Sequence, residues 1–177
     1  MENDWRELVR KSDLMALAQK KVTKQMSKDE LERRISVFIK THNMCVLCTA
    51  RDNIPRATPI EYWADGTTLY IFADPGTKRE NIKVNPKVSV GIYDPLVGSP
   101  LSVKGMQITG EATLLTDDNP EYDEALIMRR RELVGEDIGD FKPRRGGTVI
   151  KVESKKIEFI DIALKLDGYN LRYVWEA

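Results

Sequence analysis

Short runs rich in β-forming residues, each followed by a turn signal, occupy most of the chain from residue 45 onward. Val, Ile, Tyr and Thr dominate these runs, as expected of strands on a pleated sheet. The runs span residues 45–50, 57–64, 68–74, 87–94, 101–116 and 148–161, with residues 169–177 as a further candidate. The turn signals are Asp52-Asn53, Asp65-Gly66, Pro75-Gly76, Asn85-Pro86 and Asp94-Pro95. Strand–helix–strand alternation is nearly absent, so the pattern predicts an antiparallel sheet.

Helical patterns flank these runs. The clearest covers residues 27–43, where Ser27 and Glu30 have the spacing of a capping box. The apolar residues that follow recur at helical spacing: Leu31, Ile35, Phe38 and Ile39. Residues 3–21 and 118–133 predict further helices, the latter starting near Pro120.

The elements together predict a mainly β protein, a small antiparallel barrel with flanking helices. We expect residues 1–26 to form a helical extension and residues 27–177 to form the barrel domain. Gly105 and Gly110, inside the longest run, are expected to mark β-bulges.

The charge balance excludes one class of function. The chain of 177 residues carries 28 Lys and Arg against 28 Asp and Glu. A protein that holds nucleic acid by bulk electrostatics would carry an excess of cations, although a local basic site remains compatible with neutrality. No apolar run is long enough to span a bilayer, and residues 1–13 lack the apolar core of a secretion signal. We therefore expect a cytoplasmic protein without nucleic-acid or membrane partners.

Cys45 and Cys48 form a C-x-x-C pair and are the only cysteines. Such pairs are typical of redox dithiols and of zinc half-sites. In a strand, residues three apart point to opposite faces, with Cα atoms ~10 Å apart, whereas a disulfide needs about 7 Å or less. His42 is the only histidine, so four soft zinc ligands cannot be assembled. We expect free thiols, at least one of them in the core, and no metal site. A helical segment here would revive the redox interpretation.

The residues after the Pro75-Gly76 turn carry an unusual charge pattern. Thr77 and Glu80 have capping-box spacing, yet Lys78 and Arg79 then fall in the first helical turn. Cations at that end oppose the helix dipole. An anion held by the free N–H groups, the Thr hydroxyl and the two cations would remove the conflict. A solvated surface pair explains the pattern equally well. Arg56, at the start of a strand, is by itself best explained as an exposed edge residue.

The order of these motifs resembles the FMN-binding split-barrel family related to pyridoxamine 5'-phosphate oxidase. That family has a strand ending in Thr, a strand with an early basic residue and a strand with an aromatic–small ending. A Ser/Thr–Lys/Arg pair, an Asn, an N-P-x-V-S strand and an x-x-G-x-A strand follow. This chain shows, in the same order, Thr49, Arg56, Phe72-Ala73, Thr77-Lys78-Arg79, Asn81, residues 85–89 and residues 109–112. The resemblance covers residues 30–116 well and the remainder loosely.

The resemblance implies a split β-barrel of six or more antiparallel strands, with FMN at the interface of a homodimer. Residue by residue, it assigns the FMN phosphate to Arg56, Thr77, Lys78 and Arg79. It places Ala57, Thr58, Pro59, Ile60, Ala73 and Asp74 along the ribityl chain and the ring. It implies that Lys104, Gly105, Met106 and Gln107 of the partner subunit close the other side. The runs around residues 88–93 and 101–105 would supply an apolar dimer face.

The chain departs from the oxidase at two places. Glu61 stands where the oxidase has a lysine, and a carboxylate there would alter the electronics of a reduced flavin. The oxidase's Arg-x-His signature is missing, because no histidine follows Arg172. Pyridoxamine-phosphate oxidase activity is therefore not expected. His42 is interpreted as a polar surface residue at a helix end, badly placed to serve as a haem ligand.

Two further groups of residues lie outside the resemblance. Residues 129–131, three arginines, are interpreted as a solvated helix end, with an active-site lid as the alternative. Tyr173 and Trp175 are expected to pack in the core or in a dimer interface rather than on a flavin ring.

The resemblance thus implies a flavin-dependent oxidoreductase that acts on a small substrate, with a nicotinamide or deazaflavin reductant; the sequence singles out no catalytic residue. The alternatives are a flavin-binding or storage module without catalysis, a deazaflavin- or haem-binding relative, and a cofactor-free interaction domain.

Overall fold

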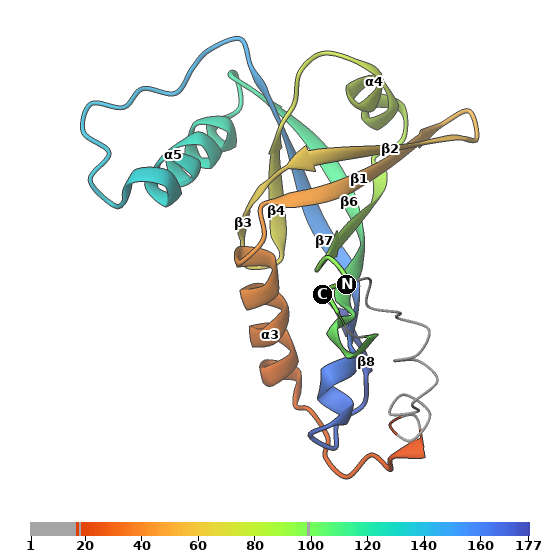
Figure 1. The fold of residues 1–177 in the computed structure, drawn as a ribbon. Helices are drawn as coiled ribbons and strands as arrows, with labels where there is room; N and C mark the ends of the chain where they lie inside the picture. Colours follow the sequence, from red (N-terminus) through yellow and green to blue (C-terminus); the bar gives the residue numbers. More distant parts are fainter. Residues whose placement is uncertain (1–16, 18, 99) are drawn as a thin grey trace, which may run out of the picture.

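A computed structural model describes residues 17, 19–98 and 100–177. Most of the predicted N-terminal helix (residues 3–21) lies outside the described residues. The described part is mainly β, as predicted: eight antiparallel strands form one sheet in the order β2-β1-β5-β6-β7-β4-β3, and β8 pairs with β7. The architecture is the predicted split β-barrel with flanking helices (Figure 1).

The strands follow the predicted runs closely. They are β1 (Met44–Arg51), β2 (Ile54–Glu61), β3 (Trp63–Asp65), β4 (Thr68–Phe72), β5 (Lys87–Tyr93), β6 (Lys104–Thr116), β7 (Thr148–Asp161) and β8 (Arg172–Glu176). The helices are α3 (Lys28–Lys40), α4 (Thr77–Val84) and α5 (Pro120–Val134), with short 3-10 turns η1 (Pro100–Ser102) and η2 (Ile162–Lys165). The predicted run 57–64 divides into β2 and β3 at the buried Tyr62, whose backbone N–H bonds Asn43 and whose hydroxyl bonds the carbonyl of Ile39.

β6 and β7 are the longest strands and form the centre of the sheet (Figure 1). Their register shifts between Thr109 and Gly110, so the bulge predicted at Gly110 is confirmed. A Cβ at Gly110 would lie 2.5 Å from the carbonyl oxygen of Glu153, which explains the glycine there. The bulge predicted at Gly105 is wrong, because pairing with β5 and β7 continues through this residue. Gly105 is instead required by the close approach of Ile92, whose oxygen would lie 2.9 Å from a Cβ.

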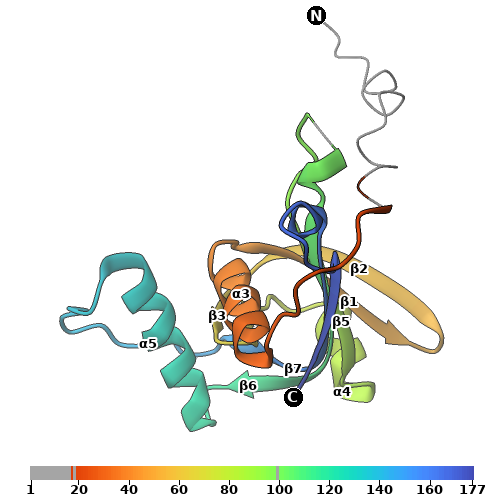
Figure 2. The ribbon, with the colours of Figure 1, turned by 90° about the horizontal axis from the view of Figure 1, so that it is seen from below.

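Two apolar clusters hold the helices against the sheet. The larger joins α3, through residues such as Ile35 and Ile39, to the inner faces of the long strands. The smaller contains Trp63, Tyr122 and Ala125 and fixes α5 beside β3 and β7. Figure 2 shows α5 set to one side of the barrel, α3 along it, and the β1–β2 hairpin extending away from the body.

The helix starts are set by local capping. Ser27 accepts a hydrogen bond from the backbone of Glu30 (3.2 Å), as the capping box predicts. Glu30 does not complete the box, because its carboxylate binds Arg33 and Arg34 instead. These side-chain hydrogen bonds to arginine lower the pKa of the Glu30 carboxyl.

Candidate cofactor site

β2 is an edge strand that carries the predicted site residues Arg56–Ile60. It pairs with β1 from Met44 opposite Glu61 to Arg51 opposite Ile54, and it ends the strand order of the described sheet. Arg56, Ala57 and Pro59 are exposed, whereas Thr58 and Ile60 are half-buried. An edge strand this open leaves backbone groups and side chains accessible to a ligand or a second chain.

α4 begins directly after the turn that follows β4. Ala73 is buried and its N–H bonds the carbonyl of Thr148 (2.9 Å), and the exposed Asp74 opens the turn. The capping box predicted for Thr77 and Glu80 is wrong. Gly76 is the N-cap residue, at a φ of 147°, and no side chain caps the helix. Thr77 is therefore the first helical residue. The N–H groups of Arg79 and Glu80 donate to the carbonyl of Gly76 (3.0 and 3.3 Å), so those of Thr77 and Lys78 are left for water or a ligand.

The Glu80 side chain, which does not form the predicted capping box, points toward the C-terminal end of α4. Its carboxylate accepts a hydrogen bond from the ammonium of Lys83 (2.9 Å), and this bond lowers the pKa of the Glu80 carboxyl. Within the described part of the chain, neither Lys78 nor Arg79 forms a close ion pair, although the charge of Arg79 also lowers the pKa of the Glu80 carboxyl.

Two side-chain amides fix α4 to β1, that of the buried Asn81 and that of the half-buried Asn85. Asn81 donates to the hydroxyl of Thr49 (3.0 Å), and Asn85 donates to the carbonyl of Ala50 (3.2 Å). Thr49 lies opposite Arg56 in the β1–β2 register. The two bonds hold α4 against the Thr49–Ala50 end of β1, and Figure 1 shows α4 beside the β1–β2 hairpin.

Two polar atoms at this end are buried without a hydrogen-bond partner: the hydroxyl oxygen of Thr58 and the Nε of Arg79. A buried polar group left unpaired costs roughly 1–3 kcal/mol, and such groups are few in native structures. Both residues belong to the predicted cofactor site. The half-burial of Lys78 and Arg79 also speaks against a fully solvated surface pair. The Thr58 hydroxyl, together with Lys78 and Arg79, therefore fits an anionic ligand that is polar along its length.

Lys104–Gln107 of β6 lie elsewhere in the same chain. They line a groove of about 570 Å³ together with residues of β5, β7 and β8. None of the other predicted site residues lines this groove, so one subunit does not bring the two halves together. Exposed apolar side chains border it: Tyr93 (64% exposed), Leu96 (65%) and Val174 (53%).

Arg129 lies near the end of β2, which the sequence did not reveal. Its side chain, 20% exposed, donates to Glu61 and to Glu132 (2.8 Å), and its guanidinium lies 5.8 Å from the centroid of the Trp63 ring. The prediction of a solvated helix end is wrong for this arginine and holds for the exposed Arg130 and Arg131. The sequence offered one signal for this contact, opposite charges in distant segments. Glu61 stands where the resemblance leads one to expect a cation, so a basic residue elsewhere in the chain could pair with it.

His42 is also more constrained than predicted. Nδ1 lies 2.7 Å from the carbonyl oxygen of Phe38, and Nε2 lies 2.7 Å from a carboxylate oxygen of Asp94. The ring is half-buried against that of Phe38, with centroids 4.1 Å apart. His42 does follow the end of α3, as predicted, but its ring is half-buried rather than on the surface, and neither nitrogen is available as a ligand in this arrangement.

Both cysteines are free thiols, as expected, and burial raises the pKa of the Cys45 thiol to about 12. Trp175 packs in the core, as expected, and its indole N–H donates to the carboxylate of Glu32 (3.4 Å).

Residues 17, 19–98 and 100–177 contain no group of three or more His, Cys, Asp or Glu able to hold a metal. Within the same residues, no helix is long and apolar enough to cross a membrane.

The fold defines a split-barrel protein with an open edge strand, β2, and with two cations in the uncapped first turn of α4. Residues 31–161 match the family model described as pyridoxamine 5'-phosphate oxidase, and the chain belongs to this family. A search of curated proteins gave no significant match.

Several solved structures share the fold. A Listeria innocua protein named after pyridoxamine 5'-phosphate oxidase is 26% identical, with 75% of this chain and 99% of that chain covered and a TM-score of 0.56. A FAD-binding protein from Mesorhizobium loti is 19% identical over 71% and 90% of the two chains, with a TM-score of 0.55. HutZ, the heme storage protein from Vibrio cholerae, is 16% identical over 71% and 90%, with a TM-score of 0.54.

Proposed function

We propose that this protein binds FMN between the subunits of a homodimer and uses it for electron transfer to or from a small substrate. Arg56, Thr77, Lys78 and Arg79 would hold the phosphate. Ala57–Ile60, with Ala73 and Asp74, would lie along the ribityl chain and the ring. Lys104–Gln107 of the second subunit would cover the other side.

The observation that carries this proposal is the pair of buried atoms without partners, Thr58 Oγ1 and Arg79 Nε. They come from β2 and α4, the two elements that would contact the cofactor. A ribityl hydroxyl and a phosphate oxygen are the kinds of group that would pair with them. The cost of burying both atoms would then be removed by the ligand.

The electrostatics at α4 also support a phosphate. The helix has no side-chain cap, and its first turn carries Lys78 and Arg79. A dianion would complement the helix dipole and both cations, whereas an uncharged ligand would leave the cations unbalanced. Charge-assisted hydrogen bonds of this kind are the stronger ones in proteins.

The subunit interface would follow from the same arrangement. The groove with Lys104–Gln107 is bordered by exposed apolar residues, and the site half on β2 is open. A second copy placed over this surface would bury apolar area and exclude water from the ring, as the site requires.

FMN, when bound, would supply the electron transfer, and the protein would supply its orientation and charge environment. Glu61 would not act as an isolated carboxylate, because Arg129 donates to it. Oxidation of pyridoxamine phosphate is not part of the proposal, since the chain lacks the Arg-x-His signature. Haem binding, the alternative that the HutZ heme storage protein suggests, is less well supported for this chain. The ring nitrogens of its only histidine, His42, face Phe38 and Asp94.

An absorption spectrum of the purified protein tests the proposal, followed by mass identification of the released chromophore. We expect a flavin spectrum and FMN. Thr77→Ala combined with Lys78→Ala should abolish binding with the fold intact, whereas Lys83→Ala, at the exposed far end of α4, should not. Reduction of the bound flavin by a nicotinamide or deazaflavin donor would support the enzyme over a storage module. A protein that remains colourless with excess FMN contradicts the proposal.

A further inference from the structure

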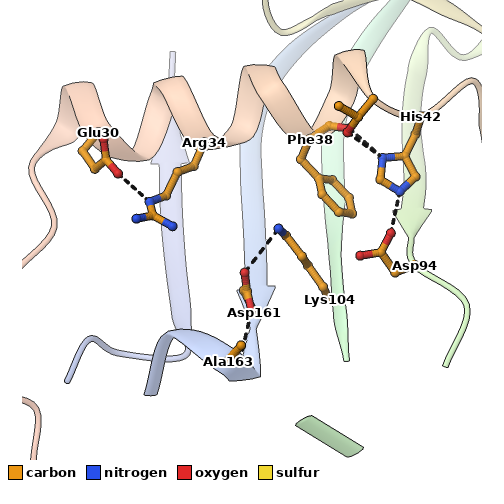
Figure 3. Close-up of polar contacts among 9 residues, drawn as sticks. Glu30, Arg34, Phe38, His42, Asp94, Lys104, Asp161 and Ala163 are labelled. Atoms are coloured by element: carbon orange, nitrogen blue, oxygen red, sulfur yellow. Dashed lines mark hydrogen bonds and ion pairs between the residues drawn. The ribbon is translucent and has the colours of Figure 1, made fainter. Parts of the chain in front are cut away.

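One face of α3 carries side chains at four-residue spacing that all point toward the long strands. Figure 3 shows Glu30, Arg34 and Phe38 in this row, with His42 following beyond the helix end. Residues four apart in a helix share a face, so the row is set by the sequence itself. The row therefore presents two charged groups of opposite sign, an aromatic ring and an imidazole on the side of the helix that faces the ends of β5, β6 and β7.

The opposite wall is formed by the strands. Lys104 of β6 and Asp161 of β7 face α3, with 3.4 Å between the ammonium nitrogen and a carboxylate oxygen (Figure 3). The Lys104 ammonium lies 5.2 Å from the ring centroid of Phe38 and 6.0 Å from that of Phe159. A cation in this position is held by two ring faces and one carboxylate at the long end of ion-pair distances.

Between these walls lies a cavity of about 240 Å³. Its charged lining consists of Arg33, Arg34, Lys104 and Asp161, so cations outnumber carboxylates three to one. Glu30, outside the lining, serves both arginines: Arg33 at 3.0 Å and Arg34 at 2.6 Å. The floor is apolar and aromatic, formed by Phe38 and Phe159.

This charge distribution identifies the kind of ligand. Counting Glu30, three cations face two carboxylates, so one positive charge remains for an anion, and the arginine fork matches a carboxylate or phosphate. The aromatic floor adds favourable contact for an apolar body next to the anionic head. The cavity is smaller than the sites that enclose drug-sized molecules, so the ligand must be small.

We propose that the cavity between α3 and the β6–β7 ends binds a small organic anion, with its anionic head between Arg34 and Lys104 and its apolar body on Phe38 and Phe159. Asp161 holds Lys104 in place until the anion arrives. Asp161 is itself fixed, since its carboxylate accepts a hydrogen bond from the backbone of Ala163 (3.1 Å). The site shares Lys104 with the proposed FMN site, and its other lining residues belong to α3, β7 and the residue after α3.

Benzoate is a suitable probe, and benzamide is its uncharged counterpart. The only histidine, His42, packs on Phe38, so its ring proton resonances report on the cavity without any labelling scheme. We expect benzoate to shift these resonances in a saturable manner, and benzamide to leave them unchanged. Arg34→Gln should weaken benzoate binding about tenfold or more, the usual effect of losing a charge-assisted hydrogen bond. Arg131→Gln, on the exposed side of α5, should bind benzoate like the unmodified protein.

Binding elsewhere would be recognised by intermolecular nuclear Overhauser effects, which need no substitution. Contacts between the benzoate ring protons and Phe38 or Phe159 are expected. Saturable binding without those contacts, equal affinity for benzamide, or full affinity in Arg34→Gln would each overturn the proposal. The FMN content separates this result from the previous proposal: Arg34→Gln should retain bound FMN, and the Thr77→Ala, Lys78→Ala variant should retain benzoate binding.

Discussion

Asn81 of α4 donates its side-chain amide to the hydroxyl of Thr49 in β1 at 3.0 Å, and both side chains are buried. Because Thr49 lies opposite Arg56, this bond fixes the cations of α4 relative to β2. The anchor is a polar contact, and the bond from Asn85 to the carbonyl of Ala50 supports it at the end of the helix. It therefore sets the geometry of the candidate site as well as the stability of the helix.

Asn81→Ala should lower the free energy of unfolding by about 1–3 kcal/mol, because the buried Thr49 hydroxyl loses its partner. Urea denaturation measures the change. The double variant Asn81→Leu, Thr49→Val should recover part of the loss, since both polar groups are then removed. Lys83→Ala, exposed on the same helix, should stay within about 0.5 kcal/mol. An unchanged stability in Asn81→Ala would contradict the anchoring role.

Gly110→Ala should destabilise the protein by about 1–3 kcal/mol, the usual cost of forcing extra atoms into a packed site. The new Cβ would meet the carbonyl oxygen of Glu153 at 2.5 Å, in the middle of the β6–β7 bulge. A thermal melt measures the effect. Gly91→Ala is the matched control: Gly91 also lies in a strand, but nothing lies within 4 Å of its Cβ position. Equal melting temperatures for the two variants would show that the close approach is not limiting.

The pair Arg129–Glu61 should contribute a measurable coupling between α5 and β2. Arg129→Gln should cost about 1 kcal/mol, because it removes the contacts to Glu61 and Glu132 and the cation over Trp63. A double-mutant cycle with Glu61→Gln should give a coupling of about 0.5 kcal/mol, small because Glu61 is 57% exposed. Arg131→Gln should have little effect. A zero coupling in the cycle would assign the cost of Arg129→Gln to Trp63 and Glu132 alone.

The strands were predictable because their signals are local. The β-branched runs and the turn pairs predicted all the strands except the division of run 57–64 into β2 and β3; the bulge at Gly110 and the start of α5 at Pro120 were also predicted. The resemblance selected one end of the β1–β2 hairpin, and the structure places α4 against β1 at Thr49, the residue opposite Arg56; the phosphate contacts themselves stay a prediction.

Features that depend on tertiary contact could not be derived in the same way. Gly76 caps α4 because β4 ends in a left-handed turn, which makes Thr77 helical and leaves the expected box unformed. Arg129 finds Glu61 across 68 positions of the chain, and His42 finds Asp94 across 52. The missing partners of Thr58 and Arg79 become visible only when burial is known.

Alkaline pH should destabilise the fold through Cys45. Burial raises the pKa of its thiol from 9.0 to about 12, so the folded state holds the proton over a range in which the unfolded chain loses it. The contribution is fully present below pH 9, and the free energy of unfolding should fall between about pH 9 and 12, by up to about 1.4 kcal/mol per pH unit. Burial also raises the pKa of the Tyr62 hydroxyl, which adds to the loss above pH 10. Urea titrations at pH 8, 9 and 10 for the unmodified protein and Cys45→Ala test this, the variant being expected to show the shallower decline. Parallel declines would mean that the Cys45 thiolate is not excluded from the folded state.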